Sequence, residues 1–504
     1  MKLKNWIKYL ASLFIIVGLT SCSSDDDVKT SGNVTLRGVN GEETTGIDVK
    51  ADATSASFSV YSSATPSVSS SESWLSASAS EPSKMNSISL ITLAIQPNTT
   101  TSARSANLNI TSGSSSMTVQ VRQEAGAEPE PEPEVPEPPT DEEQPLKGIK
   151  AMDIARDITA GWNIGNTLEA IGSETAWGNP LVNESYVAGI KAAGFNAVRI
   201  PCAWDQYIID RTTNTIKPEW LDRVNQVVNM VLEQDMYAIV NIHWDGGWLE
   251  NNIGKASKPE LIEKQKTLWT QIANRLKHYD ERLLFAGLNE PNADDVAAAQ
   301  ALLEYEQAFI DAVRATGGNN SSRTLIFQGP NTDIETTYKN FNTNPSDPAG
   351  EGYLMAEVHY YTPYQFCLME KDENWGKVAW FWGKDNHVEG SDRNSTWGEE
   401  DWMKQMFGYM KEQFVDNGIP VVLGEYGAYP NEHLKNLQTE ADKENIDKSR
   451  AYFYQCVQEF GKEKGLIPFV WDTGEIINRN NGSVKNQWLL DAIMAGANAS
   501  TYPY

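Results

Sequence analysis

Two stretches decide the fold of this chain: LLFAGLNEP (283–291) and PVVLGEYG (420–427). Each is an apolar run of the length of a buried strand, and each leads into a glutamate, Glu290 or Glu425. Near-continuous apolar runs are typical of parallel strands that are covered on both faces. In a closed parallel α/β barrel the carboxyl ends of the strands meet on one face. We therefore expect the two carboxylates to converge if the surrounding chain forms such a barrel.

Residues 146–504 have the alternation that a barrel requires. Between the apolar runs lie helix-period segments, such as 219–234, in which five aliphatic residues form one stripe. No GxGxxG or P-loop follows any run, which argues against a doubly wound nucleotide-binding sheet. The pattern predicts a (β/α)8 TIM barrel with enlarged loops. The eight expected strands lie in residues 160–166, 195–201, 237–244, 283–290, 323–329, 354–361, 420–427 and 467–474.

The chain before the barrel has a different composition. Residues 33–127 are rich in Ser and Thr and contain short alternating runs separated by turn residues, which predicts an all-β immunoglobulin-like sandwich. Residues 128–145 contain eight acidic residues, no basic residue and alternating proline. Such a segment favours extended polyproline II, so we interpret it as a spacer between two domains.

The N-terminal domain resembles the BACON module, which accompanies bacterial carbohydrate enzymes. The resemblance rests on Trp74-Leu75, on 104–108 and on 119–123. The name of that module implies carbohydrate binding, but its aromatic residues here (Phe58, Tyr61 and Trp74) fall close to core positions. We therefore favour a spacer over a glycan-binding module.

The N-terminus carries the pattern of an export signal. A basic start precedes an apolar run (9–19), which predicts a signal peptide over residues 1–21. The following Leu19-Thr20-Ser21-Cys22 resembles a bacterial lipobox, which implies cleavage before Cys22, acylation of that cysteine and a flexible tether over 22–32. The acidic tract at 25–27 resembles a surface-export tag, so we expect a lipid-anchored protein on the outer membrane, facing the exterior. The alternative is an ordinary cleaved signal with an incidental cysteine.

Charge and cysteine content exclude several classes of function. The formal net charge of −27 argues against nucleic acid as a partner and is compatible with a neutral polymer. If Cys22 is lipidated, Cys202, Cys367 and Cys456 remain, without CxxC spacing, so we expect neither a disulfide framework nor a metal cage. The first barrel strand lacks the histidine pair of metal-dependent barrel hydrolases. We predict no metal, no cofactor and a monomer.

Polar residues gather at the ends of the predicted barrel strands. A single glutamate in such a place is most often a helix cap, but the joint pattern is much more specific. In a barrel all of these side chains would point into one cleft. They are Arg199, His243, Asn289, Glu290, His359, Tyr361, Glu425 and Trp471.

These strand-end motifs resemble glycoside hydrolase family 5, a retaining family on the TIM barrel, over residues from about 150 to 500. Segment 359–366 (HYYTPYQF) is similar to subfamily 4, which contains endo-β-1,4-glucanases and xyloglucanases. The motifs that carry the resemblance are VRIP (198–201), NIH (241–243), LNEP (288–291), HYY (359–361), LGEYG (423–427) and VWD (470–472).

The resemblance implies a division of labour between the two glutamates. Glu290 donates a proton to the leaving oxygen, and Glu425 attacks the anomeric carbon as a carboxylate. Retaining enzymes hold the two groups about 5–5.5 Å apart. Arg199 is expected to favour the anionic form of Glu425, and Tyr361 to hold its attacking oxygen.

The remaining strand-end residues are expected to support the acid and the sugar. His359 would orient Glu290 or tune its proton, and Asn289 would bond the sugar 2-hydroxyl. His243 would bond other hydroxyls, while Trp471 would stack under the sugar. Without the family pattern, a satisfied structural network is the simpler interpretation of the histidines.

Further aromatic residues in the loops after strands could hold a polysaccharide in an open groove. Sequence does not separate them from packing residues, and we choose Trp248 and Trp375 as the substrate-binding candidates. The full set is Trp204, Trp244, Trp248, Tyr364, Trp375, Trp380 and Trp382.

The combined prediction is a surface-anchored, retaining endo-β-1,4-glucanase that cuts plant cell-wall glucan, with xyloglucan as the first choice of substrate. Mixed-linkage glucan, cellulose-type glucan, xylan and mannan remain alternatives within the enzyme class. The alternative from another class is a non-catalytic surface glycan-binding lipoprotein with a vestigial barrel.

Overall fold

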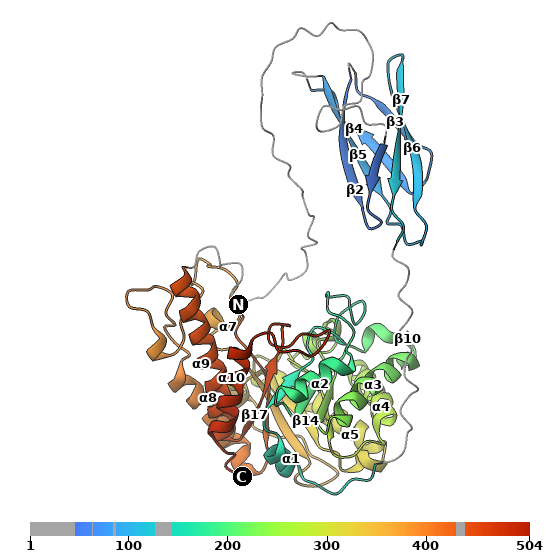
Figure 1. Cartoon of the computed structure of the whole chain (residues 1–504). Coiled ribbons are helices and arrows are strands. Elements are labelled where there is room, and N and C mark those ends of the chain that lie inside the picture. The colour runs from blue at the N-terminus through green and yellow to red at the C-terminus, as the bar shows by residue number, and fades with distance from the viewer. Residues whose placement is uncertain (1–45, 63, 84–86, 127–143, 430–438) are drawn as a thin grey trace. The chain divides into compact units, whose positions relative to one another are not determined.

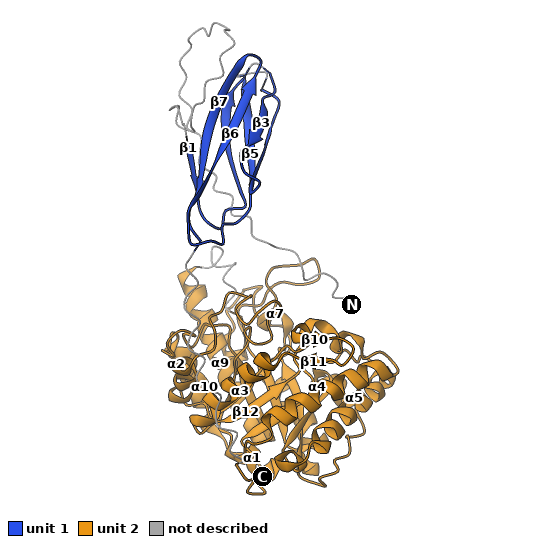
Figure 2. Ribbon diagram, turned by 90° about the vertical axis from the view of Figure 1, so that its right-hand side faces the viewer, with its two compact units in different colours: residues 1–135 blue, residues 136–504 orange. Residues whose placement is uncertain are grey.

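The computed structural model describes residues 46–62, 64–83, 87–126, 144–429 and 439–504. The chain divides into two compact units, residues 1–135 and 136–504 (Figure 2). The predicted signal peptide (1–21), the tether with Cys22 and nearly all of the 128–145 spacer lie outside the described residues. Of the helices in the described part of the chain, none is both long and apolar enough to cross a bilayer.

The N-terminal unit is a sandwich of two sheets, as predicted. One sheet has the order β1-β7-β6-β3 and the other β2-β5-β4. Only β1 and β7 pair in parallel among the described strands of this unit. Every second residue of β5 and β6 is buried, so the sequence alternation marks the inner faces. The strands are Gly46–Val49, Ser55–Tyr61, Ser67–Ser70, Leu75–Ala79, Ile88–Ile95, Arg104–Ser112 and Ser115–Gln123 for β1 to β7.

Of the three aromatic residues expected close to the core of this unit, two are buried and Tyr61 is not. Phe58 and Trp74 are buried, and the guanidinium of Arg104 lies 4.5 Å above the Trp74 ring. Tyr61 keeps 37% of its surface exposed at the end of β2. One partly exposed ring does not form a stacking platform for a sugar chain.

The C-terminal unit contains a closed parallel barrel with the order β12-β13-β14-β15-β16-β17-β8-β9. Each of the eight predicted strands contributes one barrel strand, so the predicted (β/α)8 TIM fold is confirmed. These strands are β8 Gly161–Asn163, β9 Ala197–Ile200, β12 Tyr237–Asn241, β13 Leu283–Ala286, β14 Leu325–Asp333, β15 Leu354–Tyr360, β16 Val421–Tyr426 and β17 Leu466–Trp471.

Helices surround the barrel, and a short hairpin of β10 Ile208–Asp210 and β11 Thr215–Ile216 lies in one loop (Figure 1). The predicted stripe on α3 is buried, apart from the partly buried Leu221 at its start. The helices are α1 Ala151–Asp157, α2 Glu184–Ala192, α3 Pro218–Glu233, α4 Pro259–Leu276, α5 Val296–Ala315, α6 Ile334–Asn340, α7 Tyr364–Cys367, α8 Glu400–Gln413, α9 Glu440–Lys464 and α10 Gln487–Ala499.

The interior of the barrel changes from apolar to polar along the strands. At one end α1 packs against a layer that contains Ile239, Ile326 and Met355. Since side chains two residues apart share a face of a strand, the next layer is built from residues two positions further on. That layer contains Arg199, Asn241, Gln328 and Glu357, all fully buried. The polar layer forms the floor on which the strand-end residues stand.

Candidate active site

Glu425 lies inside β16 near its carboxyl end and has a bonded partner for each oxygen. Arg199 Nη1 donates to its Oε1 at 2.8 Å, and the Tyr361 hydroxyl donates to its Oε2 at 3.0 Å. Burial raises the pKa of Glu425, while His359 and Arg199 oppose that rise. The predicted influence of Arg199 is therefore present, but burial outweighs it. A carboxylate held by two donors has one defined direction of attack.

Glu290 lies four residues beyond the end of β13, and 43% of its side chain is exposed. His359 Nδ1 lies 2.8 Å from its Oε1. One carboxylate oxygen each from Glu290 and Glu425 and one His359 nitrogen all lie within 4.8 Å of one another. This separation is compatible with the spacing that retaining glycosidases use.

His359 lies between the two glutamates, inside β15. Its Nδ1 is 3.8 Å from Glu425 Oε2, and its Nε2 is 3.4 Å from Glu357 Oε1. Burial opposes a charge on the ring, but Glu425, Glu290 and Glu357 overcome that effect and raise the pKa of His359 to about 10. The ring is therefore an imidazolium with both nitrogens protonated.

Asn289 is fixed from two sides. Arg199 Nη2 donates to its Oδ1 at 2.8 Å, and its Nδ2 lies 3.4 Å from Glu250 Oε2. The same Glu250 oxygen accepts the backbone N–H of Glu290 at 3.0 Å. Burial, with the nearby Glu290, raises the pKa of Glu250 to about 8. Glu250 is a site residue that the sequence analysis missed, because it lies in a loop without a motif.

His243 and Trp471 form one wall of the site. Their rings stack with centroids 5.7 Å apart and planes at 12°. Burial, reinforced by Arg199 and His359, lowers the pKa of His243 well below 6.5. The amide Nδ2 of Asn241 lies 3.2 Å from His243 Nδ1, so Nδ1 is the acceptor and Nε2 carries the proton. An N–H at Nε2 could donate to a sugar hydroxyl, which is the role that the sequence predicts for His243.

The structure therefore brings the eight strand-end residues of the prediction into one site. By distance alone, Glu290, His359 and Glu425 could also hold a metal ion. A protonated imidazole has no lone pair for a metal, however, and Arg199 adds a second positive charge beside the same carboxylates. The residues fit a pair of catalytic carboxylates better than a cation.

The loop aromatic residues divide into packing and exposed sets. Trp204, Trp380 and Trp382 are buried and belong to the core. Trp248 is half-buried against the core, donates to Asp245, and has the Lys264 ammonium 3.9 Å above its ring. Trp375 is 60% exposed, with the Tyr364 ring 6.1 Å away. Exposed aromatic residues that the sequence analysis did not select are Trp177, Trp397 and Tyr429.

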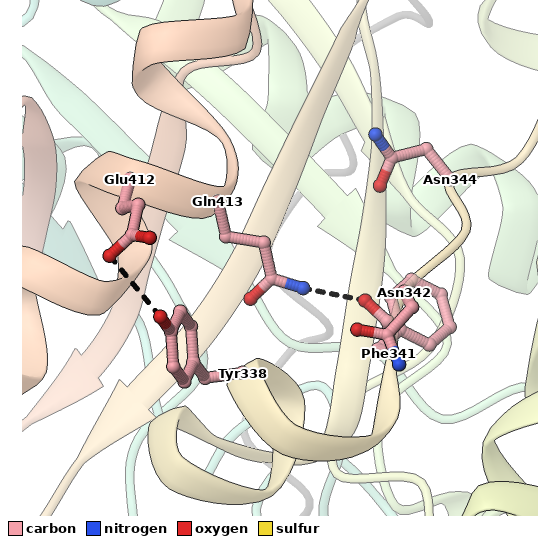
Figure 3. Close-up of a pocket in the computed structure, with 6 residues that line it drawn as sticks. All are labelled: Tyr338, Phe341, Asn342, Asn344, Glu412 and Gln413. Atoms are coloured by element: carbon pink, nitrogen blue, oxygen red, sulfur yellow. Dashed lines mark hydrogen bonds between the residues drawn. The ribbon is translucent and has the colours of Figure 1, made fainter.

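A pocket of about 420 Å³ lies between α6 and α8, outside the barrel (Figure 3). Tyr338, Glu412 and Gln413 line it, and the Tyr338 ring stacks on Tyr409 at 4.2 Å. None of the strand-end residues lines this pocket. The pocket is therefore separate from the carboxylate pair.

Comparison with known proteins agrees with this geometry. The family model "Cellulase (glycosyl hydrolase family 5)" matches residues 163–475, and the BACON model, described as a putative binding domain, matches residues 63–124. The chain belongs to glycosyl hydrolase family 5. It is a glycoside hydrolase, and the family's retaining chemistry accounts for the carboxylate pair.

Three relatives illustrate the range of this family. The xyloglucan-specific endo-beta-1,4-glucanase of Bacteroides ovatus is 38% identical over 372 residues, covering 70% of this chain and 71% of the relative. The solved structure of a Bacteroides ovatus family 5 xyloglucanase with a heptasaccharide has a TM-score of 0.64 at 32% identity, covering 90% of this chain and 98% of that one. A broad-specificity endoglucanase from Bacteroides salanitronis has a TM-score of 0.62 at 30% identity, covering 71% and 98%.

Proposed function

We propose that this family 5 hydrolase is an endo-xyloglucanase that cuts the β-1,4-glucan backbone of plant xyloglucan outside the cell. The observation that carries the catalytic part is the pair Glu290 and Glu425, with oxygens within 4.8 Å and different hydrogen-bond partners for each. The substrate part is supported by similarity to two proteins described as acting on xyloglucan.

The reaction proceeds in two displacements. In the first, Glu425 attacks the anomeric carbon while Glu290 gives its proton to the departing glucan oxygen, which leaves a glycosyl ester on Glu425. In the second, Glu290 takes a proton from water, the water oxygen attacks the same carbon, and Glu425 departs as a carboxylate. Two inversions give net retention of the anomeric configuration.

Exposed aromatic rings in the loop between β15 and α8 support a long polysaccharide as the substrate. Tyr364, Trp375 and Trp397 keep 42%, 60% and 44% of their surfaces exposed. Large flat faces of this kind stack on glucose rings of an extended chain. Internal cutting of a long polymer follows from binding at several such rings.

Two alternatives compete with this proposal. A broader endoglucanase activity on unbranched or mixed-linkage glucan is favoured by the likeness to a broad-specificity enzyme. A glycan-binding protein without catalysis is disfavoured, because a decayed site would not keep both carboxylates with all their hydrogen-bond partners. Loop shape beside the cleavage point decides whether branched glucan is accepted.

The location of the protein is part of the proposal. We infer that Cys22 is acylated after removal of residues 1–21 and that the lipid anchors a monomer to the outer membrane, facing the exterior. Cys22→Ser in the full chain should move the protein from the membrane fraction to the soluble fraction. If the variant stays with the membrane, the anchor is elsewhere.

The experiment that tests the activity is release of reducing ends by a protein that comprises residues 23–504. Xyloglucan, mixed-linkage glucan, carboxymethylcellulose, xylan and galactomannan are compared, with Glu290→Gln as the control. Preference for xyloglucan that is lost in the control supports both the mechanism and the substrate. Activity mainly on unbranched glucan keeps the mechanism and overturns the substrate. Binding without turnover of any substrate supports the non-catalytic alternative.

A further inference from the structure

A third carboxylate lies directly beneath the two catalytic glutamates. Glu357 is part of β15, two residues before His359, and is fully buried. Its Oε1 lies 2.9 Å from Arg199 Nε and 3.4 Å from His359 Nε2, while its Oε2 accepts from Gln328 Nε2 at 2.6 Å. Glu357 therefore contacts both cations of the site, Arg199 and His359.

The backbone around Glu357 is built to admit this carboxylate. A Cβ atom on Gly424 would lie 2.0 Å from Glu357 Oε1, closer than atoms can approach. Gly424 directly precedes Glu425, so the glycine of the LGEYG motif provides the space that Glu357 occupies. If Glu357 only filled space, an uncharged side chain would serve as well, and no carboxylate would be needed beside β16.

Titratable groups from five barrel strands surround His359. Arg199 comes from β9, His243 follows β12, Glu290 follows β13, Glu357 is in β15, Tyr361 follows β15, and Glu425 is in β16. Burial opposes the charge of Glu357, but Arg199 and His359 lower its pKa, so it is an anion. His243 is neutral and the pKa of Tyr361 is raised well above its usual value by burial.

We propose that Glu357 is the permanent counter-anion of the site, a positioning residue that holds Arg199 and His359 charged and bonded while one negative charge alternates between Glu425 and Glu290. This proposal rests on the double-displacement function of the two catalytic glutamates.

The charge balance of the cycle supports this role. The first displacement requires an anionic Glu425 and a protonated Glu290, so at that point Arg199 and His359 supply two positive charges against the two negative charges of Glu357 and Glu425. In the glycosyl-enzyme, Glu425 is an uncharged ester and Glu290 has given up its proton, so Glu357 and Glu290 are the two anions. The buried network is neutral in both states only because Glu357 never changes its charge. Without the charge of Glu357, the site has one excess positive charge in both states. That excess favours loss of the His359 proton, because Arg199 does not deprotonate.

The test is Glu357→Gln, and the chain offers a matched control. Glu306 of α5 is also fully buried and touches the same neighbour, since its Oε1 accepts the backbone N–H of Gln328 at 3.0 Å. Burial raises the pKa of Glu306 well above 4.5, which favours the uncharged acid. Glu306→Gln therefore makes the same change of shape at a second buried glutamate that contacts Gln328, on α5 rather than among the strand residues that contact Arg199 and His359.

Two quantities are measured for each protein. One is kcat on the best polysaccharide, and the other is the titration of His359 by NMR of the enzyme labelled with ¹⁵N-histidine, in which the chain has five histidines and a His359→Asn sample assigns the signal. We expect Glu357→Gln to lower kcat at least about tenfold and the pKa of His359 by at least about one unit. Glu306→Gln should change neither, and Glu357→Asp should keep His359 charged.

Opposite results overturn the proposal. Equal behaviour of Glu357→Gln and Glu306→Gln would reduce Glu357 to a packing residue. If Glu357→Gln does not fold, the wild-type titration still decides, because a His359 that is neutral at pH 7.5 contradicts a permanent counter-anion. The NMR titration does not depend on turnover, so a failure of the proposed function on every polysaccharide is distinguishable from a failure of this inference.

Discussion

At the scale of single residues, the site is held together by buried charged side chains that each contact several partners. Arg199 donates hydrogen bonds to Glu425 and Asn289 and forms an ion pair with Glu357 from one guanidinium, which its planar fork of five N–H groups allows. A lysine at position 199 could hold only part of this set. The nucleophile is consequently fixed by the same group that fixes the residue expected to bond the sugar 2-hydroxyl.

Removal of the nucleophile should abolish turnover without abolishing binding. For Glu425→Ala we expect kcat to fall by roughly a thousandfold or more, because no other carboxylate can form the ester. Reducing-end release measures turnover, and affinity electrophoresis in polysaccharide gels measures binding. Turnover at the wild-type rate would mean that Glu425 is not the nucleophile.

The buried acid Glu250 should make stability depend on pH. Its folded pKa of about 8 lies above the ordinary value of 4.5, so the folded state keeps a proton that the unfolded chain has lost. The stability that Glu250 contributes is therefore present below pH 4.5 and is lost as the pH rises towards 8. Glu250→Gln cannot titrate at this position. The free energy of unfolding of the variant minus that of the wild type should therefore be larger at pH 8 than at pH 5, by about 1 kcal/mol or more. Denaturant titrations at both pH values check this, and a difference that stays constant would contradict it.

At the scale of elements, the stretches 283–291 and 420–427 each contain a glycine where the backbone passes a buried acid. A Cβ on Gly287 would lie 2.5 Å from Glu306 Oε2, just as a Cβ on Gly424 would meet Glu357. Gly424 lies on β16 directly before Glu425, and Gly287 follows the last residue of β13, three residues before Glu290. Close approach of a side chain to the backbone is a general reason for glycine inside a strand.

Alanine at position 424 should be destabilising for this reason. We expect Gly424→Ala to lower the free energy of unfolding by about 1–3 kcal/mol, the usual cost of overpacking. Gly408, inside α8, is the matched control, because its added Cβ would have no neighbour within 4 Å. Gly408→Ala should raise stability by up to about 1 kcal/mol through helix propensity. Thermal unfolding of both variants measures this difference in stability. If Gly424→Ala were as stable as Gly408→Ala, Glu357 would be able to move aside.

The loop between β15 and α8 is the element expected to bind substrate away from the cleavage point. Trp375→Ala should raise KM several-fold with little change in kcat, since loss of one stacked ring costs about 1 kcal/mol or more. Trp488→Ala is a suitable control, because this partly exposed ring belongs to α10 and is not in a loop after a strand. An unchanged KM for Trp375→Ala would remove that residue from the groove.

At the scale of the whole molecule, the barrel is complete in itself. Its first described residues are fastened to it: Gln144 N donates to His278 O, and Lys147 N donates to Glu281 Oε2. The core of the N-terminal sandwich is formed by its own two sheets. The two units therefore have separate cores, and all the site residues found in the described part of the chain belong to the second unit.

A protein of residues 144–504 should consequently keep the activity of the 23–504 form. We expect kcat/KM on a soluble polysaccharide to agree within about twofold, because the shorter protein retains every contact of the site. Pull-down on insoluble polysaccharide, measured for both forms and for residues 33–127 alone, tests the spacer interpretation. Retention of the isolated sandwich on the polysaccharide would make it a binding domain.

By itself, the sequence predicted the barrel and the convergence of Glu290 and Glu425. Eight apolar runs each became a barrel strand, since continuous burial on both faces leaves a strong local signal. Glu290 and Glu425 could be paired because the topology brings the carboxyl ends of all parallel strands together, whatever the details of packing. Their partners Arg199, His359 and Tyr361 were found by the same rule.

Only the tertiary structure decided which other groups belong to the site. Glu357 is a charged residue within an apolar run, a signal that could have been noticed, but Glu306 has the same local pattern as a surface glutamate on a helix. Whether Trp382 packs or Trp375 stacks also depends on how a long loop folds over the barrel. Burial and hydrogen bonding of these side chains are set by neighbours distant in sequence, so local pattern carries no record of them.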